Sequence, residues 1–239
     1  PRSTQGVSSA ASDVYKRQKV TNMYAMFVEA YKFNQDISNW DVNSVTNMST
    51  MFMDAISFNQ PIGSWNVSNV TNMQYMFQGC TDFNQNISNW NTSKVTTMRS
   101  MFTSSSFNQP IGDWDTSSVV TMRNMFGFNK FFNQDISKWD VSKVESMRVM
   151  FLKCESFNQP IGEWNVSNVN NMQRMFNEAT SFNQDLSKWC VENITAEPSD
   201  FSYYSPLEDS NKPIWGTCPS DTDPIIGTWT LTNEVWTGS

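Results

Sequence analysis

The 239-residue chain contains no histidine. The commonest general base and the commonest metal-ligand type are therefore both missing. Charged residues make up only 16% of the chain, and the formal net charge is −7, which disfavours nucleic acid and anionic lipid as partners. No apolar run approaches the ~20 residues that a membrane-spanning helix needs. We therefore predict that the chain is not an enzyme, and we expect no cofactor, no metal, no nucleic-acid partner and no transmembrane segment.

What the chain has in abundance is one repeated unit. Tryptophan recurs at steps of 24 or 25 residues, and a Phe-Asn-Gln triplet and a Met-x-x-Met-Phe element keep the same steps. Fourteen of the fifteen methionines lie in the second element. A fixed period in this range is typical of stacked repeats whose single units cannot bury their own apolar face. We count seven units, which begin at Val20, Val45, Val70, Val95, Val119, Val144 and Val169.

Each unit contains two patterns, for which the second unit serves as the example. Over residues 45–55 the apolar positions recur as on one face of a helix, which predicts a short helix of about ten residues. Over residues 62–67 a β-branched and aromatic run predicts a short extended strand. The predicted fold is an α/β repeat solenoid of seven coils. Each coil would hold one short helix and one short parallel strand, and strands of neighbouring coils would pair at ~4.8 Å.

The units alternate in pairs. Odd units carry Asp or Asn followed by Ile-Ser or Leu-Ser after the Phe-Asn-Gln triplet, whereas even units carry Pro-Ile-Gly. This alternation keeps Asp36, Asp135 and Asp185 from stacking on a carboxylate in the next coil, where like charges would be destabilising. Duplication of a two-unit module explains the alternation equally well, so both accounts stay open.

The consensus V-T-N-M-x-x-M-F-x-x-A-x-x-F-N-Q-D-I-x-x-W-D-V-S resembles the repeats of about 25 residues in BspA-type leucine-rich-repeat surface proteins. Such repeats occur in mycoplasma lipoproteins, marine bacteria and some protists. The resemblance covers about residues 20–193. It implies a leucine-rich-repeat-like solenoid on a secreted or cell-surface protein with a loose link to adhesion, and it brings no catalytic residue.

Four segments are expected along the chain. Residues 1–18 do not share the repeat, and their end resembles translated sequencing-adapter DNA, so we interpret them as non-native. Residues 19–193 form the seven-repeat solenoid. Residues 194–219 resemble the closing segment of marine-bacterial members and are expected to cap the last coil. Residues 220–239 read as a linker and the start of a truncated β domain, in which Gly227-Thr228-Trp229 is similar to the opening of lipocalin-like barrels.

The four cysteines divide into two kinds. Cys80 and Cys154 occupy a helix position that is alanine in other units, and we expect them to be buried thiols that act as small apolar groups. Cys190 and Cys218 flank the expected cap, and Cys190 stands where other units carry Asp or Asn. We predict that these two form a disulfide that staples the cap, which suits an oxidising compartment.

Three regular columns have a structural and a functional interpretation. The Met-x-x-Met stripe could hold copper, but its helical spacing favours core packing. The asparagines of the Phe-Asn-Gln triplets could bind a ligand or ion, but backbone satisfaction is the favoured role. The residues that follow the tryptophans could bind calcium weakly, but turn capping is favoured. These last residues are Asp41, Asn66, Asn91, Asp115, Asp140 and Asn165.

The residue before each tryptophan changes from unit to unit while the core repeats. We predict that this column recognises a protein or glycan on another surface, through a monomeric extracellular or cell-surface protein. The column consists of Asn39, Ser64, Asn89, Asp113, Lys138, Glu163 and Lys188.

Three other interpretations compete with this one. Asp113 and Glu163 share the column two coils apart, as a glycosidase pair would, but such pairs arise in any repeat. A purely structural spacer that displays an adjacent domain is one alternative function. Ice binding is another, although the threonine column that it needs breaks at Val120, Glu145 and Asn170.

Overall fold

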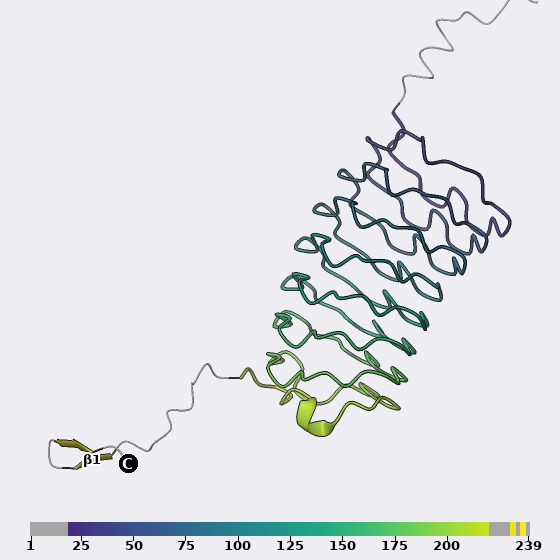
Figure 1. Cartoon of the computed structure of the whole chain (residues 1–239). Coiled ribbons are helices and arrows are strands. Elements are labelled where there is room, and N and C mark those ends of the chain that lie inside the picture. The colour runs from purple at the N-terminus through teal and green to yellow at the C-terminus, as the bar shows by residue number, and fades with distance from the viewer. Residues whose placement is uncertain (1–18, 220–229, 233–234, 238–239) are drawn as a thin grey trace, which may run out of the picture.

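The computed structural model describes residues 19–219, 230–232 and 235–237. Neighbouring units lie side by side in sequence order along one axis (Figure 1). One parallel β-bridge joins each pair of neighbouring units at the third residue of the unit, as between Asn47 and Asn72. Beside this bridge, the N–H of Thr71 donates to the Thr46 carbonyl at 2.8 Å, and the N–H of Met48 donates to the Asn72 carbonyl at 3.0 Å. The period of the sequence is therefore also the period of the structure.

The short helix expected over residues 45–55 is not formed, and no α-helix occurs within residues 19–219. The segment consists of overlapping turns, closed by hydrogen bonds between residues three apart, such as that from the Met51 N–H to the Met48 carbonyl. The N–H groups of alternate residues donate instead to the next unit, at 2.7–3.0 Å in the second unit. A helix would use all these N–H donors within its own unit. The turns form instead because they leave alternate N–H groups available to bond the next unit.

The backbone of these turns has two residues per unit in the left-handed region. In the second unit they are Thr50 and Asp54, with φ of 61° and 57°. The same two positions recur four residues apart in every unit. Left-handed conformations cost energy for residues other than glycine. They persist here because they direct alternate N–H groups along the axis of the stack.

The expected strand over residues 62–67 is also absent as a regular element. Between neighbouring units the parallel pairing consists of the single bridge near the start of each unit. The regular elements of the described residues are a short 3₁₀ helix, η1 (Asp209–Asn211), and two strands, β1 (Thr230–Thr232) and β2 (Val235–Thr237). Strand β1 pairs antiparallel with β2. The interpretations of residues 1–18 and of Gly227-Thr228-Trp229 fall outside the described residues.

The core consists of aromatic columns that run through the stack. Phe52 and Phe58 stack on each other within one unit at 4.0 Å between ring centroids. Along the axis, Phe52 stacks on Phe77 at 5.7 Å, and Phe58 stacks on Phe83 at 5.8 Å. The column of Phe52 stacks ring on ring through all seven units, and the column of Phe58 contributes one ring per unit. From the second unit onward the rings of both columns are fully buried. Burying one such ring contributes about 1.5–3 kcal/mol, so each unit depends on its neighbours.

The tryptophans line the same core. From the second unit to the seventh they are 1–4% exposed, and each indole N–H donates to a carbonyl of the preceding unit. Trp139, for example, donates to the Ile111 carbonyl at 3.0 Å. Trp40 belongs to the first unit and is 38% exposed. The indole therefore acts as both core filler and a hydrogen-bonded link between units.

Residues 194–219 continue the stack beyond the seventh unit. Phe176 donates its N–H to the Phe201 carbonyl at 2.8 Å, in the way that earlier units bond their neighbours. Phe201 packs edge-on against Phe176, with 5.4 Å between ring centroids, and also against Trp215 at 5.0 Å. Helix η1 lies at this end of the stack (Figure 1), where the Leu186 N–H donates to the Asn211 carbonyl. The segment thus covers apolar surface that the last repeat would otherwise expose.

Candidate binding surface

The candidate surface is the column of residues that precede the tryptophans. All seven of its members are exposed, while the following tryptophan is buried from the second unit onward. In the later units the column alternates in charge. Lys138 lies 3.5 Å from Asp113, and Lys188 lies 2.7 Å from Glu163. Their side chains remain 68–88% exposed, so these ion pairs contribute little to stability and leave the charges accessible.

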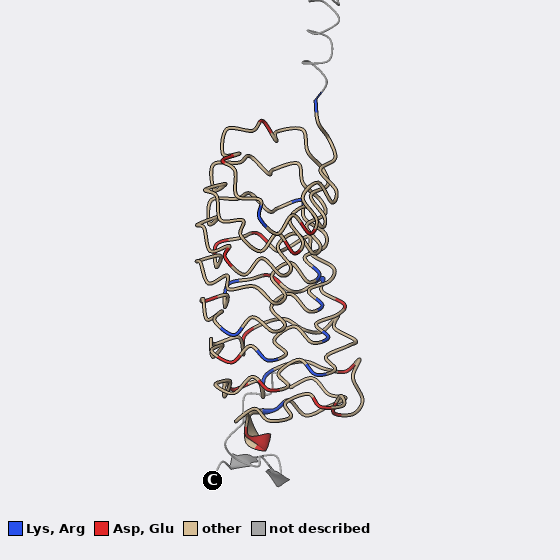
Figure 2. Cartoon of the chain, turned by 90° about the vertical axis from the view of Figure 1, so that its right-hand side faces the viewer, with Lys and Arg blue, Asp and Glu red and all other residues tan. Residues whose placement is uncertain are grey.

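A shallow hollow accompanies the middle of this column. It has a volume of about 210 Å³ and is lined by Pro110, Gly112, Asp113, Gln134, Asp135 and Lys138. Two members of the column therefore lie at a concave part of the surface. Charged residues are more frequent along the later units than along the earlier ones (Figure 2). The hollow belongs to this more strongly charged part of the chain.

The two carboxylates considered as a glycosidase pair face lysines. Asp113 is paired with Lys138 and Glu163 with Lys188 in neighbouring units. Their side chains are 88% and 78% exposed. A glycosidase pair typically flanks its substrate in a cleft, whereas these two carboxylates are exposed and each is paired with a lysine.

The asparagine column of the Phe-Asn-Gln triplets has the structural role that was favoured for it. The side-chain oxygen of Asn59 accepts the backbone N–H of Asn84 at 3.1 Å and the side-chain amide of Gln85 at 2.9 Å. Asn34, Asn84, Asn108, Asn133 and Asn158 likewise accept the next asparagine's N–H. The side-chain oxygens are thus engaged between units.

The column after the tryptophans caps turns, as predicted. The Asp140 carboxylate accepts the backbone N–H of Ser142, two residues on, at 2.9 Å. The same contact is made by Asp41, Asn66, Asn91, Asp115 and Asn165. Hydrogen bonds from Ser142 lower the pKa of Asp140 below its ordinary value. The side-chain oxygens of this column therefore accept hydrogen bonds from the backbone N–H groups two residues further along the chain.

The methionine stripe and two of the cysteines belong to the core, as predicted. From the second unit onward, both methionines of each Met-x-x-Met element are fully buried. Cys80 and Cys154 are free, fully buried thiols. Burial raises the pKa of both thiols, and the Cys80 Sγ lies 2.8 Å from the Phe52 carbonyl oxygen. They are therefore poor nucleophiles and fill space as small apolar groups.

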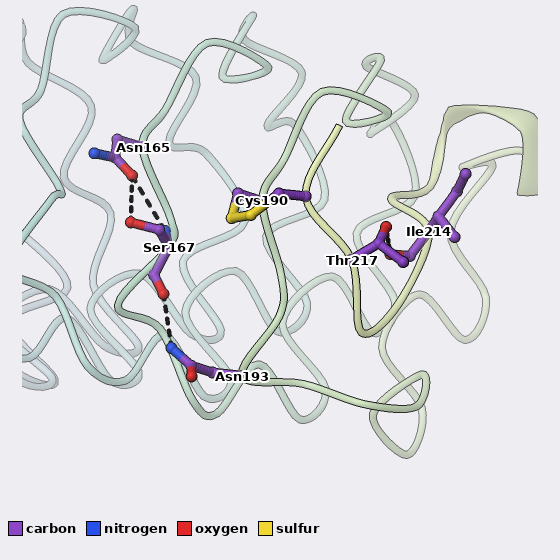
Figure 3. The surroundings of a disulfide bond; sticks show 7 residues. Asn165, Ser167, Cys190, Asn193, Ile214 and Thr217 are labelled. Atoms are coloured by element: carbon purple, nitrogen blue, oxygen red, sulfur yellow. Dashed lines mark hydrogen bonds between the residues drawn. A yellow bond between two sulfur atoms is a disulfide. The ribbon is translucent and has the colours of Figure 1, made fainter. Parts of the chain in front are cut away.

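The predicted disulfide between Cys190 and Cys218 is confirmed. It joins the last repeat to the end of the closing segment (Figure 3). Beside it, the Val191 N–H donates to the Thr217 carbonyl. Around it, the Ser167 carbonyl accepts the side-chain amide of Asn193 at 2.7 Å. Glu192 lies close to both sulfurs, and this trio is the one potential metal-ligand cluster among the described residues. Its two sulfurs are already bonded to each other.

Sequence reasoning missed one charged feature of the surface. The residue after the first methionine of Met-x-x-Met-Phe is arginine in three consecutive units, at Arg99, Arg123 and Arg148. All three side chains are partly exposed. The row could have been found from the sequence by aligning the seven units. This is the one column of the alignment in which three consecutive units carry arginine.

The stack and its surface define the chain as a tandem-repeat protein. The chain belongs to the family described as Mycoplasma protein of unknown function, DUF285, whose model matches twice in tandem, over residues 3–109 and 103–212. The first match begins inside the segment that we interpreted as non-native. Comparison with curated proteins and with solved structures returns no match. Among the residues that the structure describes, no helix has the length and hydropathy needed to cross a bilayer.

Proposed function

We propose that the chain is a non-catalytic repeat protein of the cell surface or the extracellular space that binds a protein or glycan of another surface. In this proposal the stack is a leucine-rich-repeat-like solenoid of the BspA type and acts as a monomer. The disulfide between Cys190 and Cys218 supports an oxidising location, because structural disulfides persist there.

One observation carries the proposal: the variable column before the tryptophans is exposed in every unit, whereas the constant columns are engaged. The asparagine oxygens bond the next unit, the second polar column caps turns, and the methionines fill the core. Specific recognition needs side chains that differ along the surface and remain accessible. The column that contains Asp113, Lys138, Glu163 and Lys188 meets both conditions. Its alternating charges would select a partner with a matching pattern.

The proposal is tested with the full chain on a printed array of neutral and acidic oligosaccharides and on a panel of extracellular-matrix proteins. Replacing Asp113, Lys138, Glu163 and Lys188 together by serine should weaken binding of any captured probe at least tenfold. The matched control removes another exposed inter-unit ion pair, Lys130–Glu155, by the same substitution. If the folded quadruple variant bound the probe as tightly as wild type, the recognition site would lie outside the column before the tryptophans. The absence of any captured probe would favour a structural spacer.

A further inference from the structure

Three arginines form a row on the surface of three consecutive units. Arg99, Arg123 and Arg148 each lie two residues after a bridge residue, and the bridges Thr97–Thr121 and Thr121–Ser146 hold these units in register. The row therefore has one guanidinium per unit. With units spaced by the ~4.8 Å of parallel pairing, the three span about 10 Å.

The charges of this row are not neutralised within the described residues. None of the seven ion pairs found there includes any of the three arginines. Four of these pairs join neighbouring units and a fifth joins the seventh unit to the closing segment, and each places opposite charges together. The arginine row instead places like charges in neighbouring units. The pKa of Arg123 is lowered, mainly by burial and also by the positive charges of Arg99 and Arg148. Like charges in adjacent positions destabilise a stack, so the row costs stability.

Neutral contacts hold the row at both ends. The Arg99 guanidinium lies over the Tyr75 ring, 5.3 Å from its centroid. At the other end, the Arg148 Nε donates to the Gln173 side-chain oxygen at 2.9 Å. These contacts orient the guanidinium groups without cancelling their charge. An oriented guanidinium presents a planar fork that matches sulfate and carboxylate groups.

We propose that the row of Arg99, Arg123 and Arg148 binds an acidic polysaccharide, a linear chain that carries sulfate or carboxylate groups. The row is narrow, and its rim consists of neutral hydrogen-bonding residues: Gln74, Thr97, Thr121, Ser146 and Gln173. Amides and hydroxyls suit the hydroxyl groups between the anionic groups of such a chain. Tyr75 contacts the row at one end, but the rim residues themselves are neither aromatic nor aliphatic, unlike the anchors typical of a peptide interface. The net charge of −7 opposes a broad nucleic-acid or anionic lipid surface, but a narrow row avoids most of that repulsion.

The test replaces all three arginines by glutamine in the full chain. Glutamine already occupies this position in the third and seventh units, as Gln74 and Gln173, so the stack accepts it. Binding is measured by surface plasmon resonance to heparin as the sulfated probe, polygalacturonate as the carboxylated probe and neutral dextran as the blank. We expect the wild type to bind one of the acidic chains but not dextran, and the triple variant to bind at least tenfold more weakly. Binding by the wild type should weaken as salt rises.

The matched control removes three positive charges elsewhere, by replacing Lys94, Lys130 and Lys143 with glutamine. Its affinity should stay within about twofold of wild type if the row itself is the site. Equal loss in both triple variants would show a diffuse electrostatic effect and overturn the proposal. It would also be overturned by equal or tighter binding to poly-glutamate or to phosphatidylserine vesicles, or by no binding to either polysaccharide. The serine variant of the column before the tryptophans should still bind the acidic chain, so the two proposals fail separately.

Discussion

Gly63 lies against the backbone carbonyl of Asn86 in the next unit so closely that a Cβ atom at residue 63 would collide with the oxygen. Gly112 and Gly162 meet the carbonyls of Asp135 and Asp185 in the same way. In each case the glycine belongs to an even unit and the carbonyl to the following odd unit. The glycine of Pro-Ile-Gly in the even units is thus a steric requirement of the unit that follows. The sequence left two explanations of the alternation open, charge spacing and module duplication. Neither explanation includes this contact.

Replacing Gly112 by serine, the residue that odd units carry at this position, should destabilise the stack by about 1–3 kcal/mol, because backbone atoms must move to admit the Cβ. The control is the reverse exchange, Ser137→Gly, in the next unit. It introduces no collision and should cost less than about 1 kcal/mol, through added chain flexibility and loss of the Ser137 hydroxyl contact with Asp135. Chemical denaturation measures both. Equal stability of Gly112→Ser and wild type would show that the contact relaxes freely.

Replacing Trp139 by phenylalanine should destabilise the protein by about 1–3 kcal/mol. The change removes the hydrogen bond to the Ile111 carbonyl and leaves a small void in a fully packed core. The Trp40→Phe variant is the matched control, because Trp40 is 38% exposed and its indole N–H makes no hydrogen bond within the described residues. Its cost should be under about 1 kcal/mol. A similar loss in both variants, measured by thermal unfolding, would contradict the linking role of the buried indoles.

Removing the disulfide should loosen the end of the stack. The bond between Cys190 and Cys218 closes a loop of 28 residues in sequence, for which the chain-entropy account gives about 2–4 kcal/mol. The double variant to serine should therefore unfold at lower denaturant concentration, and hydrogen exchange should rise first in residues 194–219. The Cys80→Ala variant tests a free buried thiol instead and should leave exchange in that segment unchanged. Protection of the segment without the disulfide would show that packing of Phe201 suffices.

Acid should weaken the turns that aspartates cap. Hydrogen bonds from the serine two residues on lower the pKa of Asp135 and Asp185 below the ordinary value of 3.8. A lowered folded-state pKa means that these carboxylates contribute stability that is fully present above that ordinary value. The contribution is lost as the pH falls through the lower, folded-state pKa.

Asparagine in place of both aspartates should therefore reduce the loss of stability between pH 7 and acid, because it keeps the turn but does not titrate. Asn86 already serves this role in the third unit, where its side-chain oxygen accepts the Ser88 N–H. Denaturation at a series of pH values measures the effect. The Asp82→Asn variant is the control, since the Asp82 side chain makes no hydrogen bond among the described residues and the change therefore removes no capped turn. An unchanged profile in the double variant would contradict the assignment.

The repeat period, the buried aromatic and methionine columns, the roles of the two polar columns and the pairing of Cys190 with Cys218 could all be predicted from the sequence. Each depends on residue type at a constant spacing, which the stack preserves. The local backbone could not be predicted this way. The spacing of Met48, Met51, Phe52 and Ala55 fits one face of a helix, but overlapping turns place the same side chains in the core. Only the position of the neighbouring unit decides between the two structures.

The sequence by itself therefore determined which side chains are buried, because burial follows from a period that every unit repeats. The tertiary structure alone decided where the backbone hydrogen bonds go, because alternate N–H groups find their acceptors about 25 residues away. It also decided that Gly63 must lack a side chain and that Arg99, Arg123 and Arg148 share one row. Both are contacts between units, and residues a full period apart become neighbours only when the units stack.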